Sequence, residues 1–191
     1  SDLGIDIVRS QILISMGYGL NDDELRIGNQ SDITMFGCAI QCRVTTEDPS
    51  NDFKPDYGRL IAYRSASGMG IRLDAGSAYP GAKISPYFDS LLVKVTAWGR
   101  TLPGSAQRMH RALREFRIRG VKTNIGFLLN LLVHPEFQAG KTTVNFIKDN
   151  PQMLEPLGWR DRGTKMLRYL AEVIVNGHPD VKYRDQGVIF L

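Results

Sequence analysis

The apolar residues near the start of the chain recur at intervals of three and four. This spacing predicts a helix that begins near Asp2 or Asp6 and ends before Gly17. Its apolar face would consist of Ile5, Val8, Ile12 and Met16. A polar stretch follows and separates this helix from the next predicted element.

From residue 38 to residue 45 the pattern changes to a period of two, which is typical of a strand with one buried face. The apolar face holds Cys38, Ile40, Cys42 and Val44. Arg43 belongs to the opposite face and is therefore predicted to point away from the core. Further strands are predicted at 58–66, 70–76 and 90–99. Their connections are too short for crossover helices, so we expect antiparallel pairing.

A helix is predicted after the last strand, with Ser105 as its N-cap. One side of this helix holds Met109, Leu113 and Phe116, and much of the rest holds Arg108, Arg111 and Arg114. This division of apolar and charged residues is typical of a helix that packs on a sheet and leaves its other side in water.

A second helix is predicted from Thr123 or Asn124 to His134, where Pro135 would end it. Residues 140–154 predict a turn or edge strand and a short helix. The predicted fold class is therefore α+β, an antiparallel sheet flanked by helices. From Trp159 onward a separate amphipathic segment is predicted, with its start signal at Asp161.

The composition is that of an ordinary globular protein: 191 residues, 42% hydrophobic and 23% charged, with a net charge of +4. No apolar run approaches the ~18 residues of a membrane-spanning helix, and the first residues do not form a secretory signal. We therefore expect no membrane partner. The chain begins without methionine, and we expect it to be a piece of a longer protein.

The basic residues are concentrated between Arg108 and Lys122, where six Lys or Arg accompany one acid, Glu115. No aromatic residues alternate with these arginines to stack on bases, so we expect no nucleic-acid partner. Nonspecific binding of polyanions stays open as an alternative, and it would show a steep dependence on salt.

Motifs for autonomous catalysis are missing from the sequence. It contains no phosphate loop, no dinucleotide fingerprint and no HExxH, and its histidines are far apart and expected at the surface or at helix ends. Cys38 and Cys42 would lie ~13 Å apart on one strand, too far for a disulfide, which fits a reducing compartment. We expect no metal ligands in the chain.

Two sets of arginines are the candidates for ligand binding. Arg43 could offer a fixed positive charge to a carboxylate, a phosphate or a developing enolate oxygen, or it could form an ion pair with Glu47 or Asp48. The residues alone favour the ion pair. In the segment FRIRGV, Arg117 and Arg119 would lie ~7 Å apart on one face of an extended segment, a spacing that suits two phosphate oxygens. The alternative for these two is a solvated charged surface.

Four blocks in fixed order carry a family resemblance: CRVTTEDP, FKPDYGRLIAYRSASGMGIRLDAG, ISPYFDSLLVKVTAWG and REFRIRGVKTN. Over essentially its whole length the chain resembles the C-terminal part of the biotin carboxylase domain of the pyruvate carboxylase family. A further block near the end of the chain, RDRGTKMLRYL, favours this family over the biotin carboxylase subunit of acetyl-CoA carboxylase.

The resemblance implies a reaction and a division of the chain. The complete family domain uses MgATP to activate bicarbonate and carboxylates biotin, and another domain passes the carboxyl group to pyruvate to give oxaloacetate. Residues 1–30 would be a helical remnant of the ATP-grasp domain, 31–150 the biotin carboxylase C-terminal domain, and 151–191 the start of the allosteric domain. Most family ligands for ATP and Mg²⁺ lie outside these segments, so we expect the piece alone to be inactive.

The resemblance also implies partners and a location. The partners would be the rest of the carboxylase chain, a biotinylated carrier domain and a second copy in a homo-oligomer. The location would be the cytoplasm in bacteria or the mitochondrial matrix in eukaryotes. The alternative is a non-catalytic module that binds acetyl-CoA and pairs subunits.

Family roles transfer to individual residues as follows. Arg43 matches the arginine that stabilises the biotin enolate oxygen, and Val144 matches an aliphatic residue of the adenine pocket. The acetyl-CoA activator would bind Arg117, Arg119, Asp161 and Arg162. The dimer interface would include Met69, Arg72 and Asp89, with Met69 in place of a phenylalanine that is common there.

Overall fold

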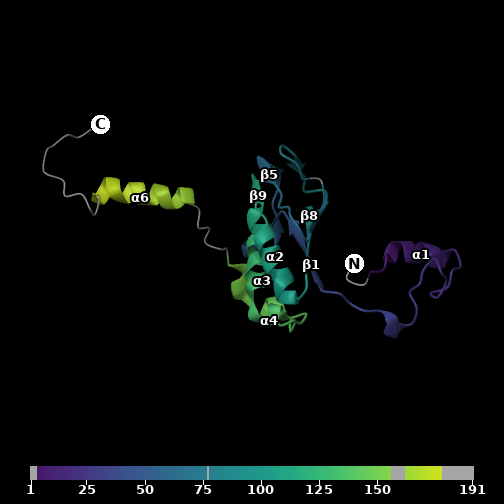
Figure 1. Cartoon of the computed structure of the whole chain (residues 1–191). Coiled ribbons are helices and arrows are strands. Elements are labelled where there is room, and N and C mark those ends of the chain that lie inside the picture. The colour runs from purple at the N-terminus through teal and green to yellow at the C-terminus, as the bar shows by residue number, and fades with distance from the viewer. Residues whose placement is uncertain (1–3, 77, 156–161, 178–191) are drawn as a thin grey trace. The chain divides into compact units, whose positions relative to one another are not determined.

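The computed structural model describes residues 4–76, 78–155 and 162–177 (Figure 1). The chain divides into two compact units, residues 1–156 and residues 157–191. The core lies in the first unit. No helix in the described part of the chain is long and apolar enough to span a bilayer.

The predicted first helix is confirmed as α1, Ile7–Ser15. Its N-cap is Asp6, whose side chain accepts a hydrogen bond of 3.0 Å from the backbone N–H of Arg9. This contact satisfies one of the backbone donors that a helix start leaves unpaired. A 3-10 turn, η1, follows at Gln30–Asp32.

The main sheet has three antiparallel strands in the order β1-β8-β6, of which β1 and β8 are labelled in Figure 1. Their bounds are Cys38–Thr45 for β1, Leu91–Gly99 for β8 and Ile71–Ala75 for β6. Cys42 lies opposite Val95, and Val95 lies opposite Leu73, so one face of the sheet is apolar across all three strands. In the next row Arg43, Lys94 and Asp74 lie on the outer face. The period-two prediction is therefore confirmed.

The remaining strands form three short antiparallel pairs. These are β2 (Glu47–Asp48) with β3 (Lys54–Pro55), β4 (Gly58–Arg59) with β7 (Lys83–Ile84), and β5 (Ala62–Arg64) with β9 (Arg117–Arg119). The single strand predicted at 58–66 is wrong, because the backbone changes partner between β4 and β5. Leu60 donates to Ala82 O at 2.9 Å, whereas Ile61 donates to Arg119 O at 2.8 Å.

Gly120 allows this change of partner. Its φ is +105°, and a β-carbon there would collide with the carbonyl oxygen of Arg59. Only glycine lets the backbone after β9 approach β4 so closely.

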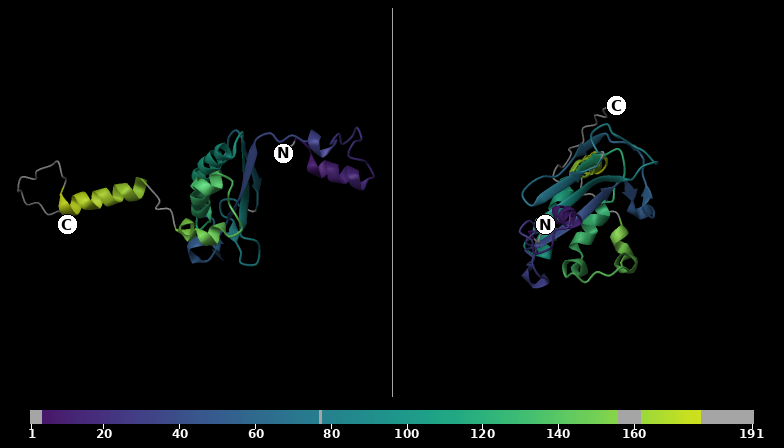
Figure 2. Two further views of the ribbon diagram at one scale, coloured as in Figure 1. Left: turned by 90° about the horizontal axis from the view of Figure 1, so that it is seen from below. Right: turned by 90° about the vertical axis from the view of Figure 1, so that its right-hand side faces the viewer.

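Helix α2 spans Leu102–Glu115 and packs on the inner face of the sheet (Figure 2). The prediction that Ser105 is its N-cap is wrong. The N-cap is Thr101, whose side-chain oxygen accepts a hydrogen bond from Gly104 N. Ser105 lies one turn later and is fully buried, where its hydroxyl donates to Cys38 O at 2.6 Å. A serine that satisfies a strand carbonyl inside the core gives the same sequence signal as a cap.

The second predicted helix is confirmed as α3, Ile125–Val133, but Pro135 begins a further helix instead of only ending this one. Proline is tolerated at a helix start because its missing N–H would be unpaired there. After α3 the first unit contains α4 (Pro135–Gln138), α5 (Phe146–Asp149) and the 3-10 turn η3 (Pro151–Leu154). The second unit contains α6 (Arg162–Asn176). Another 3-10 turn, η2 (Pro49–Asn51), follows β2. Residues 140–145 form a loop with turns at both ends and no strand.

The buried core runs from Ile40 to Met153 and joins the sheet to α2, α3, α5 and η3. This arrangement is α+β, as predicted. Asn130 on α3 donates to Met153 O and Glu155 O, so residues 151–155 are attached to the first unit. The assignment of residues 1–30 and 151–191 to neighbouring domains stays a prediction.

Candidate functional site

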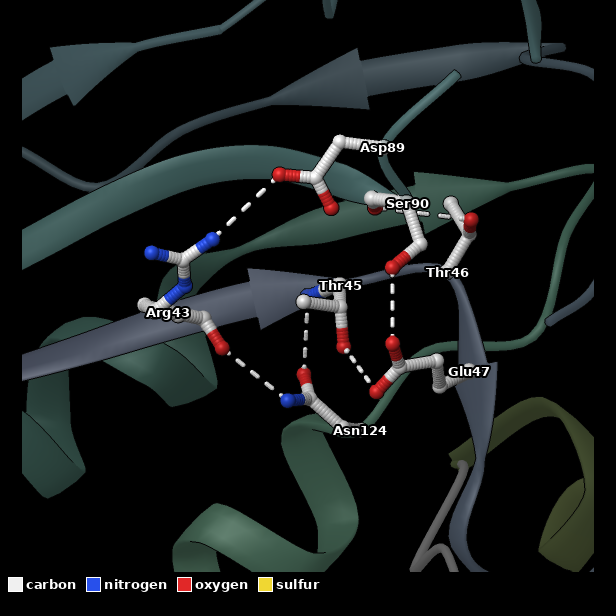
Figure 3. Close-up of polar contacts among 7 residues, drawn as sticks. All are labelled: Arg43, Thr45, Thr46, Glu47, Asp89, Ser90 and Asn124. Carbon is white, nitrogen blue, oxygen red and sulfur yellow. Dashed lines mark hydrogen bonds and ion pairs between the residues drawn. The ribbon is translucent and has the colours of Figure 1, made fainter. Parts of the chain in front are cut away.

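Arg43 lies near the end of β1 on the outer face of the sheet, as its position in the alternation predicts. Its side chain is 56% exposed, and Nη2 lies 3.3 Å from Asp89 Oδ2 (Figure 3). The predicted ion pair with Glu47 or Asp48 is wrong. The structure instead pairs a predicted catalytic residue with a predicted interface residue 46 positions away.

The acids that follow β1 fix the turn. Glu47 accepts a hydrogen bond of 2.7 Å from Ser90 Oγ and one of 3.0 Å from Thr45 Oγ1 (Figure 3). The backbone N–H of Thr46 donates to Ser90 O at 2.9 Å. Ser90 directly follows Asp89, so these contacts also fix the backbone beside the partner of Arg43.

Asp48 makes a separate set of contacts. It accepts hydrogen bonds from Ser50 and from the ammonium group of Lys122. The hydrogen bond from Lys122 is the main cause that holds the pKa of Asp48 below its ordinary value, and the same contact raises the pKa of Lys122. Both acids after β1 are therefore already engaged, which explains why neither pairs with Arg43.

Asn124 fixes the backbone of Arg43 from the start of α3. Its side-chain N–H donates to Arg43 O at 2.9 Å, and its side-chain oxygen accepts from Thr45 N at 3.0 Å (Figure 3). Its own backbone N–H donates to Thr45 O at 3.2 Å. Asn124 is only 7% exposed. We predicted Asn124 only as a possible helix start, and its side chain makes no capping bond.

The Arg43–Asp89 pair is easily exchanged. The side chain of Asp89 is 67% exposed, and surface ion pairs of this kind contribute about 1 kcal/mol or less. An anionic or partly anionic ligand can therefore replace Asp89 at little cost. Because Asn124 holds the backbone of Arg43, its α-carbon would stay in place during such an exchange.

The predicted interface residues all belong to or border the outer side of the sheet. Arg72 on β6 pairs with Asp74 at 2.8 Å, and Met69, in the turn before β6, is 92% exposed. A groove runs over this face, lined among others by Gln41, Arg72 and Trp98. That Met69, Arg72 and Asp89 form part of a dimer interface stays a prediction.

Arg117 and Arg119 are both exposed on β9, with the half-buried Ile118 between them. Neither has an ion-pair partner among the residues that the structure describes. Asp161, predicted beside them, lies outside the described residues. Arg162 begins α6, and its side chain also lies outside them.

Val144 is fully exposed in the turn before α5. In the described ranges no group of three or more His, Cys, Asp or Glu could hold a metal ion. That Val144 contributes to an adenine pocket stays a prediction.

The described cysteine and histidine side chains are buried in the core or placed at helix ends and surfaces, apart from the candidate site. Cys38 and Cys42 are both free, and burial raises the pKa of Cys42 to about 12, so its thiol stays protonated. His134 lies between α3 and α4, where its Nδ1 accepts from Glu136 N and its ring contacts Phe146. Burial and the nearby Arg114 lower the pKa of His110. His178 lies outside the described residues.

Comparison with known proteins matches residues 41–149 to the biotin carboxylase C-terminal domain. The chain is 51% identical over 181 residues to the pyruvate carboxylase of Staphylococcus aureus and 52% identical over 173 residues to the mitochondrial pyruvate carboxylase of Homo sapiens. These alignments cover 95% and 91% of the chain but only 16% and 14% of the relatives. The chain thus spans about one sixth of the length of the curated relatives it matches.

Solved structures give the same result. The Rhizobium etli pyruvate carboxylase with the allosteric activator acetyl coenzyme-A superposes with a TM-score of 0.76 at 52% identity, over 97% of this chain and 18% of that one. The biotin carboxylase subunit of a pyruvate carboxylase superposes with a TM-score of 0.70 at 35% identity, over 82% and 33%. The chain therefore belongs to the biotin carboxylase C-terminal domain family.

Proposed function

We propose that this chain is the part of a pyruvate carboxylase that completes its biotin carboxylase site. The whole enzyme would carboxylate biotin with MgATP and bicarbonate and convert pyruvate to oxaloacetate. The observation that supports this proposal is the placement of Arg43: its charge is exposed on a sheet face, while its backbone is held by the buried Asn124.

Arg43 would act by electrostatic stabilisation. Its guanidinium stays protonated and presents rigid N–H donors, which suits the ureido oxygen of biotin as that oxygen gains negative charge. Asp89 would orient the guanidinium before biotin arrives. The proposed role needs the charge in place beforehand, because a preorganised donor costs no rearrangement at the moment of reaction.

The cofactors are proposed to bind largely through other parts of the enzyme. ATP and Mg²⁺ would supply the chemical activation of bicarbonate, and among the described residues Val144 is the candidate contact, to the adenine ring. Biotin would arrive on a biotinylated carrier domain. The exposed outer face near Arg43 leaves room for such a delivered group.

The test is Arg43→Ala in the full-length enzyme that contains this chain. Loss of one preorganised donor to a developing oxyanion lowers a rate by roughly 100-fold or more, so biotin-dependent ATP cleavage should fall by about that factor. The matched control is Arg26→Ala, since Arg26 also forms an exposed ion pair, with Asp23. An Arg43→Ala enzyme that cleaves ATP at the normal biotin-dependent rate would overturn the proposal.

A second candidate function is a non-catalytic module that binds acetyl-CoA and pairs subunits. Arg117 and Arg119, exposed and without ion-pair partners in the described part, favour it. The same experiment separates the two candidates, because this second function predicts no effect of Arg43→Ala on ATP cleavage.

A further inference from the structure

The pairing of β5 with β9 brings a third arginine to Arg117 and Arg119. The two strands are antiparallel, with Arg64 directly opposite Arg117 and Ala62 opposite Arg119. Residues directly opposite each other in an antiparallel pair have β-carbons roughly 5 Å apart and lie on the same face. Arg64, Arg117 and Arg119 are therefore neighbours on one face of this two-stranded ribbon.

This arrangement is unfavourable by itself. Like charges directly opposite each other destabilise a strand pair, and all three arginines are exposed. Within the described ranges no acid forms an ion pair with any of them. The acid nearest to Arg117 and Arg119 in the sequence is Glu115, and it forms an ion pair with Arg111 at 2.6 Å.

The ribbon cannot avoid the repulsion by shifting its register. Tyr63 lies opposite Ile118 on the other face, and both side chains pack against the core. The Tyr63 ring also contacts Phe116 edge to face, with centroids 6.4 Å apart. A shift by one residue would expose these apolar side chains and bury the arginines.

We infer that Arg64 is a binding residue for a phosphate group and forms one anion site with Arg117 and Arg119. Guanidinium groups bind phosphate through paired N–H donors, and an anion between them would convert the repulsion into attraction. The inference rests on acetyl-CoA binding at Arg117 and Arg119, the role named in the second candidate function. It adds a ligand contact from a strand 53 residues before Arg117.

The test measures acetyl-CoA activation and binding in the full-length enzyme carrying Arg64→Gln. Loss of one charge-assisted contact should raise the half-activating acetyl-CoA concentration and the Kd by about tenfold. Arg64→Lys keeps the charge but not the paired donors and should show a smaller increase. The control is Arg100→Gln, since Arg100 is also exposed and without an ion pair in the described part.

A second readout separates binding from a structural role. Without ligand, Arg64→Gln removes the like-charge contact, so the thermal midpoint should be equal to or higher than that of the parent enzyme. The rise in midpoint on adding acetyl-CoA should be smaller in the variant. A lower midpoint without ligand together with an unchanged Kd would overturn the inference.

Two further measurements show which phosphate group Arg64 contacts and whether the inference on Arg64 or the activator site itself is wrong. Acetyl-dephospho-CoA lacks the 3′-phosphate: a loss seen only with acetyl-CoA assigns Arg64 to that phosphate, and an equal loss with both ligands assigns it to the diphosphate. Arg119→Gln tests the proposed activator site itself. If Arg119→Gln weakens binding and Arg64→Gln does not, the inference on Arg64 is wrong and the proposed site stands; if neither does, both are wrong.

Discussion

The guanidinium of Arg43 is held at its base and left free at its tip. Asn124 binds the carbonyl of Arg43, whereas the charged end has only the exposed Asp89 as an ion-pair partner in the described part. A residue placed in this way can change partners without moving the strand that carries it. The neighbouring Asp48 is the opposite case, since it is 8% exposed and bound to Lys122.

The Asp48–Lys122 contact predicts a pH dependence of stability. Because the pKa of Asp48 is lower in the folded state, its contribution is present above the ordinary value of about 3.9 and is lost as the pH falls through the folded pKa. Lys122→Met removes the main cause of this lowering. The free energy of unfolding should therefore differ between parent and variant above about pH 5, and this difference should shrink progressively as the pH falls below about 4.

Urea unfolding at a series of pH values measures this difference. Lys148→Met is the control, because Lys148 is exposed on α5 and forms no ion pair in the described part. Its difference from the parent should not change with pH between 3 and 6, in the range of Asp48 titration. Parallel pH profiles for Lys122→Met and the parent would show that the contact contributes nothing to folding.

At the scale of elements, the joint between β1 and α3 connects the candidate site to the core. Asn124 stands at the start of α3 and makes three hydrogen bonds with the end of β1. The helix thus gives up a side-chain cap at this position and gains a fixed strand end. The position of Arg43 depends on this joint more than on the strand alone.

Asn124→Ala should therefore reduce both stability and catalysis. It leaves the buried N–H of Thr45 without an acceptor, which costs about 1–3 kcal/mol, and it frees the backbone of Arg43. The control is Asn130→Ala on the same helix, which likewise loses two side-chain hydrogen bonds to the backbone, both of them to carbonyls. Both variants should lower the free energy of unfolding, but only Asn124→Ala should also lower biotin-dependent ATP cleavage in the full-length enzyme.

Normal biotin-dependent ATP cleavage by the Asn124→Ala enzyme would mean that the joint only stabilises the fold. Equal losses of activity in both variants would mean that any loss of stability on α3 affects the reaction. Either result would remove Asn124 as a positioning residue for Arg43.

At the scale of the whole molecule, the stability of the first unit resides in residues up to 155. The buried core ends at Met153, which is 3% exposed, and Asn130 binds the carbonyl of Glu155. In the second unit, the helix α6 has exposed apolar residues such as Leu167 and Ile174. The buried core residues of the described part belong to the first unit.

Shortened chains test this division. A chain that ends after Pro156 should unfold with a thermal midpoint within about 2 °C of the 191-residue chain. A chain that ends after Asn150 loses the buried Met153 and should lose about 2–5 kcal/mol of stability. A large destabilisation of the chain that ends after Pro156 would show that residues 157–191 are part of the same folding unit.

Local spacing predicted most of the elements but not their joints. The strands at 38–45, 70–76 and 90–99 and the helix at 124–134 were predictable, because each carries its apolar period within one segment. The strand at 58–66 and the cap at Ser105 were wrong. In both cases a distant partner, Arg119 or Cys38, satisfies the backbone or hydroxyl group.

That Arg43 leaves the apolar face and that Arg117 and Arg119 share one side of an extended segment follows from the sequence alone, because the alternation of side chains along a strand is a local property. Three contacts depend on the folded chain: Arg43 meets Asp89, Asn124 binds the end of β1, and Arg64 lies opposite Arg117. These contacts join residues 46 to 81 positions apart. Their register is set by burial of the core, which no local pattern contains.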